Sequence, residues 1–214
     1  KSNQIEHVPD IAFPEELRWL ILTDNRIETL PESLGQCSQM QKLMLSGNRL
    51  RFLPESFAKF DKLELLRIAA NQFEQLPPWL PTLPRLAWLA FAGNPVAPAP
   101  SSDDIPMRDI PWSELQLGKL LGEGASGRIS KAQWRPQNGG LPQSVAVKVF
   151  KGTMTSDGLP ENEMAAAMAA GNHGSFVEVL GRVTQHPDGA HGLGMSLLDE
   201  GFMNLAGPPS FESC

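Results

Sequence analysis

The sequence has little cysteine and no long apolar run, and each absence excludes a class of protein. Among its 214 residues only Cys37 and Cys214 are cysteines, which is too few for a disulfide framework and is typical of a reducing compartment. A prenylation box needs residues after its cysteine, so we expect none at Cys214, the last residue of this sequence. No apolar stretch approaches the roughly 18 residues that a membrane-spanning helix needs. We expect a cytoplasmic protein without a membrane span.

The sequence also lacks an excess of basic residues. The formal net charge is −6, and residues 1–96 carry 10 Lys and Arg against 11 Asp and Glu. Proteins that bind nucleic acid usually present a basic surface, so we expect no nucleic-acid partner. The four histidines are spread over unrelated segments, and neither HExxH nor CxxC occurs. The sequence therefore predicts no metal site built from protein ligands alone.

The N-terminal half contains a repeat. Asn25, Asn48, Asn71 and Asn94 stand 23 residues apart, and each follows an LxxLxL-like pattern. The apolar frame comprises Leu17, Leu20, Leu22, Met40, Leu43, Leu45, Leu63, Leu66, Ile68, Leu86, Leu89 and Phe91, followed after each asparagine by Ile27, Leu50, Phe73 and Val96. One such unit cannot bury its apolar residues, so neighbouring units must stack. The period lies in the range of leucine-rich repeats, and residues 1–96 are predicted to form an α/β solenoid of that type, with Val96 at the end of its core.

In leucine-rich repeats the asparagine bonds to backbone groups of the turn after the strand, including those of the next coil, and we expect the same here. Asn3, Ile5 and Val8 match the same frame 22 residues before Asn25, Ile27 and Leu30. The chain therefore opens within a repeat, and we expect the parent protein to continue upstream.

The variable positions of the predicted strands form two columns on the concave side of the solenoid. They are Trp19, Lys42, Leu65 and Trp88 in one column and Ile21, Met44, Arg67 and Ala90 in the other. Trp, Met and Arg are enriched in protein interfaces, and exposed apolar columns rimmed by charge favour a protein partner or substrate, or docking on the C-terminal half. Packing of the tryptophans against neighbouring coils or a missing cap is the alternative, and the sequence leaves both open.

Residues 97–111 are rich in Pro, Ser and Asp and contain no hydrophobic segment. Proline favours extended backbone, so this stretch predicts a semi-rigid linker, more a spacer than a regulatory hinge. Without a membrane span between them, residues 1–96 and residues 112–214 must lie on the same side of any membrane.

A glycine-rich turn follows, with Gly122, Gly124 and Gly127 in a GxGxxG pattern between two apolar segments. A Walker A loop is excluded because Arg128 and Ile129 stand where Lys and Ser or Thr would be required. A dinucleotide fingerprint would need a helix at the turn, whereas a strand-like segment follows, which favours a β-hairpin. Glycines without a Cβ let backbone amides approach phosphate oxygens.

The segment Val145–Phe150 alternates as a strand and places Lys148 among apolar neighbours. Such a lysine needs a counter-charge or a phosphate, although an edge-strand lysine that reaches solvent is the alternative for a single strand. The solvent-exposed alternative would be preferred for the strand alone, but the glycine turn 21 residues upstream favours a phosphate or a counter-charge as the partner of Lys148. A GxGxxGxI turn that ends at Ile129, followed by a VAVK strand, resembles the N-terminal lobe of the protein kinases, where valine is usual at the position of this isoleucine.

That resemblance implies an α+β lobe in residues 112–214, with an antiparallel sheet and one main helix bracketed by Pro160 and Gly171. It also implies that Glu163, rather than Glu161, pairs with Lys148, which would hold the nucleotide phosphates; a solvated glutamate is the alternative. The implied ATP-binding residues are Gly122, Glu123, Gly124, Ala125, Ser126, Gly127, Ile129, Ala146, Lys148, Glu163, Met195, Ser196 and Leu198. Met195 would be the gatekeeper, and Ser196 and Leu198 would offer backbone groups to adenine.

No HRD-type catalytic loop and no DFG motif occur in these residues, so the sequence offers no catalytic residue and no Mg²⁺ ligand. The whole resembles a bacterial-type leucine-rich-repeat protein kinase, truncated near the hinge. The resemblance implies that the parent uses ATP and Mg²⁺ to phosphorylate proteins, Ser or Thr more than Tyr. The alternative is a non-catalytic repeat scaffold with a pseudokinase or truncated nucleotide-binding lobe.

Overall fold

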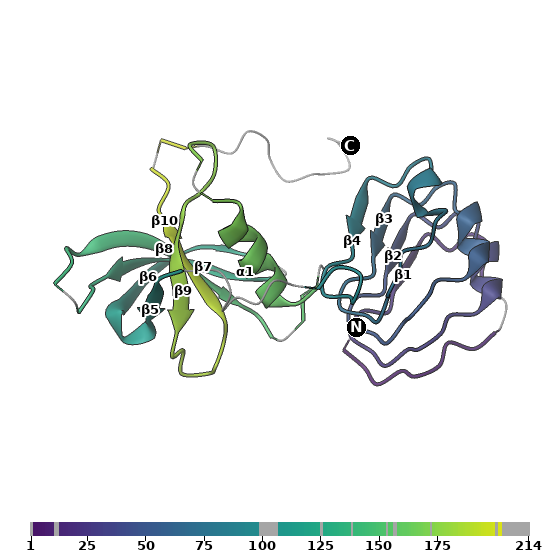
Figure 1. Cartoon of the computed structure of the whole chain (residues 1–214), viewed down its shortest axis with the longest axis horizontal. Coiled ribbons are helices and arrows are strands. Elements are labelled where there is room, and N and C mark those ends of the chain that lie inside the picture. The colour runs from purple at the N-terminus through teal and green to yellow at the C-terminus, as the bar shows by residue number, and fades with distance from the viewer. Residues whose placement is uncertain are drawn as a thin grey trace.

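Two β-sheets organise the chain (Figure 1). The computed structural model describes residues 2–10, 13–98, 107–124, 126–137, 139–152, 154–155, 158–171, 173–199 and 201–202. Ala125, Cys214 and residues 99–106 of the predicted linker lie outside this part.

The first sheet is parallel and consists of four strands of three residues each, β1 (Trp19–Ile21), β2 (Lys42–Met44), β3 (Leu65–Arg67) and β4 (Trp88–Ala90). Its order is β1-β2-β3-β4, and paired residues in neighbouring strands lie 23 positions apart in the sequence. The register therefore follows the apolar frame, which repeats at the same interval.

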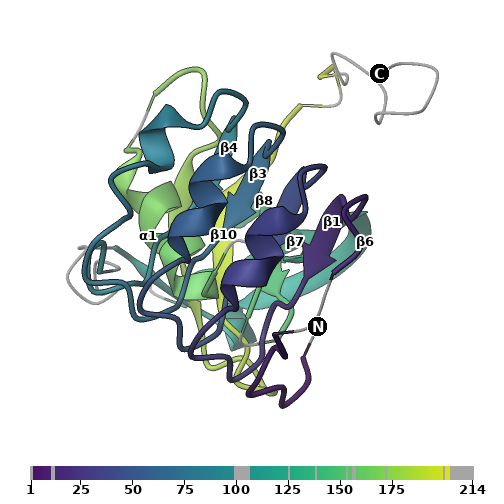
Figure 2. The same cartoon turned by 90° about the vertical axis from the view of Figure 1, so that its right-hand side faces the viewer.

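Three short 3-10 helices connect these strands, η1 (Glu32–Gln36), η2 (Glu55–Lys59) and η3 (Leu80–Thr82). Figure 2 shows them as a row along one side of the repeats. The sequence predicts an α/β solenoid, but between β1 and β4 every described helix is a 3-10 helix. Few residues are available for each crossing, and a proline precedes η1 and η2 with extended backbone, so no full α-helical turn develops.

The inward frame residues form one core between the strands and the 3-10 helices. Phe57, Phe60 and Phe73 are its largest fully buried side chains, alongside buried leucines such as Leu43 and Leu66. The predicted end of the core at Val96 is wrong, because Val96 is 38% exposed. Within the described residues no further coil of the repeat stacks on the last one, so the frame position after Asn94 has no cover.

The four repeat asparagines are buried and bond to backbone groups. Asn48 accepts at Oδ1 from the Ile27 N–H at 3.1 Å and donates from Nδ2 to the Leu22 and Leu45 carbonyls at 2.9 and 2.8 Å. Two of these partners belong to the preceding coil, whereas the sequence predicted bonds to the next coil. The bond to the Leu45 carbonyl agrees with the predicted contact at the end of the strand, whereas the other two show that Asn48 points toward the coil that precedes it in the sequence.

The second sheet has six strands in the order β5-β9-β10-β8-β7-β6. The strands are β5 (Asp109–Pro111), β6 (Leu115–Glu123), β7 (Gly127–Trp134), β8 (Gln143–Phe150), β9 (Val179–Thr184) and β10 (Gly192–Ser196). The described residues of the same half also form the 3-10 helix η4 (Trp112–Glu114) and the α-helix α1 (Pro160–Ala169). β6, β7, β8, β10 and β9 pair antiparallel, as predicted.

β5 departs from that prediction because it pairs parallel with β9 and lies in residues 97–111, the predicted linker. Ile110 at its centre is fully buried, and it sits where Gly181 and Gly194 leave room on the sheet. Asp109 adds an ion pair to Arg182 at 3.1 Å. Apolar burial and this pair therefore extend the sheet into the proline-rich segment.

Helix α1 agrees with the predicted bounds. Pro160 occupies its first turn, and Gly171 after its end has a left-handed φ of 68°. Met164 and Met168 pack with Phe150 and Leu193 in one buried cluster, which fixes the helix to the sheet. Figure 1 shows α1 between the six-stranded sheet and β4. Across the described residues, no helix has the length and apolarity that crossing a membrane requires.

Candidate functional site, a pocket below a glycine hairpin

The glycine-rich turn forms the hairpin between β6 and β7, as its pattern predicts. Gly122 pairs with Ile129 and Glu123 with Arg128, and the Gly124 N–H donates to the Gly127 carbonyl at 2.9 Å. A Cβ on Gly127 would lie 2.5 Å from the Val149 carbonyl oxygen, so neighbouring backbone excludes any larger residue. Gly122 and Gly124 have no described atom within 4 Å of a built Cβ. Their missing side chains therefore leave open space beside the loop.

An ion pair holds this hairpin to the end of β8. Lys151 Nζ lies 2.5 Å from Glu123 Oε1 and also donates to the Gly124 carbonyl at 3.3 Å. The Ser126 carbonyl accepts from the Lys151 N–H at 2.9 Å. The hydrogen bond from Lys151, and next its charge, lower the pKa of Glu123 below its ordinary value. Side chain and backbone of one lysine thus fix both sides of the loop.

Lys148 lies on β8 and forms an ion pair with Glu163 of α1. The Lys148 side chain is 14% exposed, and its Nζ lies 4.7 Å from the centroid of the Phe150 ring. Glu161 instead lies 3.2 Å from His191 Nε2. The structure therefore brings together the predicted pair, and Glu161 points to a different partner.

Five of the predicted residues converge on a cavity of about 580 Å³ below the hairpin. It is lined by Leu121, Ile129, Ala146, Val177, Met195, Ser196, Leu197, Leu198, Asp199 and Phe202. Met195 pairs with Ala146 across β10 and β8, so both side chains point to the same face of the sheet. The cavity has the volume and the mainly apolar lining of a small-molecule site.

The residues predicted as a hinge lie at the rim of this cavity. The Ser196 N–H already donates to the Glu178 carbonyl at 2.9 Å, and Ser196 Oγ accepts from the Glu178 N–H at 3.1 Å. Ser196 therefore has no free N–H for a ligand. Leu198 is 51% exposed and lies beyond the end of β10. Ala125 lies outside the described residues.

The prediction missed half of the lining, namely Leu121, Val177, Leu197, Asp199 and Phe202. Leu121 could have been found, since it is the last apolar residue of β6 before Gly122. The other four follow or precede strands in irregular segments, where no periodicity marks the direction of a side chain. Within the described residues, no cluster of three or more His, Cys, Asp and Glu is arranged to hold a metal ion.

The predicted partner surface lies on the strand face of the repeats. Trp19, Ile21 and Trp88 are 56%, 46% and 51% exposed. Lys42 Nζ lies 4.2 Å from the Trp19 ring centroid, and the Arg67 guanidinium lies 5.4 Å from that of Trp88. The other members, Met44, Leu65 and Ala90, are half-buried. The tryptophans are thus open to solvent and each is flanked by a cation.

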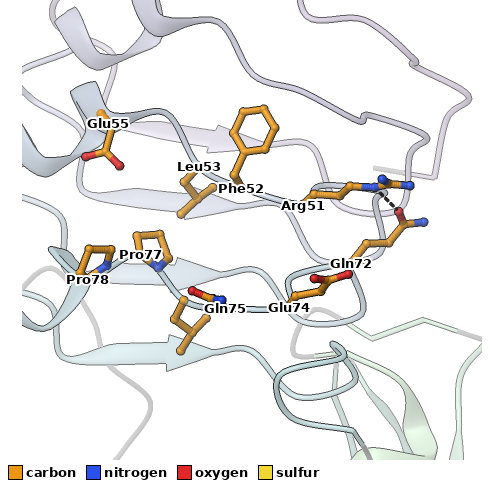
Figure 3. Close-up of a pocket in the computed structure, with 10 residues that line it drawn as sticks. Arg51, Phe52, Leu53, Glu55, Gln72, Glu74, Gln75, Pro77 and Pro78 are labelled. Atoms are coloured by element: carbon orange, nitrogen blue, oxygen red, sulfur yellow. Dashed lines mark hydrogen bonds between the residues drawn. The ribbon is translucent and has the colours of Figure 1, made fainter.

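A separate groove of about 430 Å³ lies between two successive coils (Figure 3). Arg51 and Gln72, joined by a hydrogen bond of 3.2 Å, stand at one end, and Pro77 and Pro78 lie toward the other. Phe52 is 56% exposed beside it. None of the residues predicted to bind ATP or a partner lines this groove.

A sheet-rich lobe with one main helix, a glycine hairpin and a lysine–glutamate pair fits the N-terminal lobe of a protein kinase. Residues 115–204 match the family model described as protein tyrosine and serine/threonine kinase. Residues 1–50 and 15–73 match the family model described as leucine rich repeat. Leucine-rich repeats and a protein kinase segment therefore occur in one chain, which confirms the predicted resemblance. A search of curated proteins returned no match.

Proposed function

We propose that the C-terminal half binds ATP and that the protein containing it is a protein kinase. The single observation that carries this proposal is that Ala146, which lines the apolar cavity, and Lys148, which pairs with Glu163, lie two residues apart on the same face of β8. The cavity would take the adenine ring, and Met195 and Leu198 would border it. Lys148 would contribute its charge to the phosphates, while Glu163 fixes its position.

The glycines of the hairpin support the same proposal. Gly127 is required by the neighbouring strand, but the fold places no such demand on Gly122 or Gly124, around which no described atom lies within 4 Å of a Cβ. Neither has a left-handed φ. A phosphate group that approaches the backbone closely is a physical reason for the absence of a side chain at both positions.

Mg²⁺ would accompany the nucleotide. The described residues contain no carboxylate cluster for a metal ion, so we infer that the Mg²⁺ ligands and the catalytic base come from outside this segment. The residues of the lobe bind and orient: the hairpin covers the phosphates, and Lys148 counters their charge. Phosphorylation of Ser or Thr in a protein substrate, in preference to Tyr, and a cytoplasmic location complete the proposal.

Titration calorimetry with Mg-ATP tests the nucleotide site. Lys148→Ala should weaken binding by about ten-fold or more, since a largely buried charge next to the phosphates is lost. Lys119→Ala removes an exposed lysine from β6 and serves as the matched control, with unchanged affinity. Absence of binding by the unmodified chain, or equal loss in both variants, would contradict the proposal.

For the repeats we propose recruitment of a protein partner or substrate through the strand face. Its support is the pair of exposed tryptophans with adjacent cations, Trp19 with Lys42 and Trp88 with Arg67. Such a face suits a partner with apolar and acidic side chains. If pull-down profiles stay the same after Trp19→Ala and Trp88→Ala, this role is wrong.

A non-catalytic scaffold remains the second candidate function, because the exposed face of the repeats could act without phosphoryl transfer. The two functions differ in one readout. A chain that binds Mg-ATP through Lys148 favours the kinase, whereas a chain that binds a partner but no nucleotide favours the scaffold.

A further inference from the structure

The ends of three repeat strands contact the segment that leads into α1. A Cβ on Gly47, after β2, would lie 2.8 Å from Met154 Cε, and one on Gly93, after β4, would lie 2.7 Å from Asn162 Nδ2. A Cβ on Gly158 would lie 3.0 Å from the Cβ of Ala69, which follows β3 and is fully buried. Three successive coils therefore touch one short segment of the C-terminal half.

The turn of the repeat does not itself require glycine at these positions. The residues equivalent to Gly47 and Gly93 in the other two coils are Asp24 and Ala70, and all four adopt a left-handed φ between 51° and 76°. Asp24 and Ala70 show that this backbone also accepts residues with a Cβ. At Gly47 and Gly93 the missing Cβ leaves room for the ends of the Met154 and Asn162 side chains, which would have to shift if a Cβ were added.

Within the contacting segment, Thr155 and Gly158 are joined by hydrogen bonds. The Thr155 N–H and Oγ1 both donate to the Gly158 carbonyl at 2.8 Å, and the Gly158 N–H donates to the Thr155 carbonyl at 3.4 Å. Thr155 is 3% exposed. Gly158 lies two residues before Pro160, the first residue of α1.

The contact lies one residue from the ion pair of the nucleotide site. Asn162 is followed by Glu163, and a cavity of about 340 Å³ between the halves is lined by Ala92, Ser126, Thr155, Leu159, Asn162 and Glu163. The repeat, the glycine hairpin and the first turn of α1 therefore meet at one place. The side-chain amide of Asn162 is buried there, and neither its Nδ2 nor its Oδ1 has a hydrogen-bond partner among the described residues.

We propose that Gly47, Ala69, Ala92 and Gly93, here named the docking row, form an intramolecular surface for the first turn of α1. Docking holds Glu163 against Lys148, so the repeats set the nucleotide affinity of the lobe. This second step rests on the proposed nucleotide site, whereas the docking itself does not. A partner that displaces the docking row would release the helix and lower nucleotide affinity.

Hydrogen exchange of the full chain tests the docking, with Mg-ATP calorimetry on the same samples. Gly93→Asn adds a side chain that a left-handed backbone tolerates but that meets Asn162. We expect the α1 amides to exchange about ten-fold faster and Mg-ATP to bind several-fold more weakly. Gly189→Asn is the matched control, because Gly189 also has a left-handed φ of 66° but open space around it.

A double variant guards against simple misfolding. Gly93→Asn combined with Asn162→Ala restores room at the contact and should return α1 exchange toward that of the unmodified chain. Unchanged exchange in Gly93→Asn, or no recovery in the double variant, would overturn the docking. Faster exchange with unchanged Mg-ATP affinity would overturn the coupling. If the unmodified chain binds no Mg-ATP, the proposed function fails, while the exchange data still decide the docking.

Discussion

At the scale of single residues, the repeat asparagines link each coil to the one before it. Asn71 accepts from the Leu50 N–H at 3.0 Å and donates to the Leu45 and Ile68 carbonyls at 3.0 Å each. All three hydrogen bonds are buried. One side chain therefore satisfies donors and acceptors that neither coil could pair alone.

Asn71→Ala should lower the free energy of unfolding by about 3 kcal/mol, because several buried backbone groups lose their partner. Urea unfolding followed by circular dichroism measures this. Glu74→Ala, an exposed change three residues later, is the control and should stay within about 0.5 kcal/mol. Equal small effects of both substitutions would show that the asparagine bonds contribute nothing net.

The apolar pattern predicted the burial of side chains correctly on strands that have a neighbouring coil on each side. Leu43 and Leu66, on the two inner strands, are at most 1% exposed, whereas Leu20 and Leu89 on the outer strands are only half-buried. The repeated apolar frame predicts the same burial for all four leucines, because a sequence pattern does not show how many neighbouring coils cover each position. The same cause explains the exposed Val96.

At the scale of elements, the glycines of the hairpin differ in the space around them: a Cβ would meet strand backbone at Gly127 but nothing within 4 Å at Gly124. Gly127→Ala should destabilise the lobe by about 2 kcal/mol, since its Cβ would meet strand backbone. Gly124→Ala has no such obstacle and should stabilise by about 0.5 kcal/mol through the unfolded chain. Thermal unfolding of the two variants measures the difference.

Although Gly124→Ala should stabilise the fold, we expect it to weaken the binding of Mg-ATP. Its added methyl group occupies the open side of the loop, so Mg-ATP affinity should fall about ten-fold although the fold is intact. Full affinity in Gly124→Ala would remove the loop from the binding site.

The Glu123–Lys151 pair makes the hairpin sensitive to acid. The pKa of Glu123 is lowered in the folded state from 4.5, mainly by the hydrogen bond from Lys151. The pair therefore stabilises the fold above pH 4.5, and its contribution disappears as the pH falls through the lowered pKa. Comparing the unfolding midpoints of the unmodified chain and Lys151→Met from pH 7 to 3, we expect a difference that shrinks below about pH 4.5. A constant difference would contradict this account.

Sequence predicted those elements whose pattern is local. Alternation located β8, and Pro160 with Gly171 bracketed α1. β5 escaped prediction, because three residues around Ile110 in a proline-rich segment carry no periodicity, and only the space above Gly181 and Gly194 makes a strand there. The irregular segments that complete the cavity escaped for the same reason.

At the scale of the whole molecule, the chain joins a leucine-rich-repeat half to a kinase-type lobe, and the two touch near α1. No local pattern could predict this contact, since it depends on how two separately folded cores lie against each other. The contact lies next to Glu163, so the repeats border the proposed nucleotide site.

Our central claim is that the lobe binds the phosphates of ATP through Lys148. The most direct test compares ATP with adenosine by calorimetry, in the unmodified chain and in Lys148→Ala. We predict that the substitution weakens ATP about ten-fold or more and leaves adenosine within about two-fold, because only the phosphates meet the lysine. Equal weakening of both ligands, or no change in either, would contradict the account.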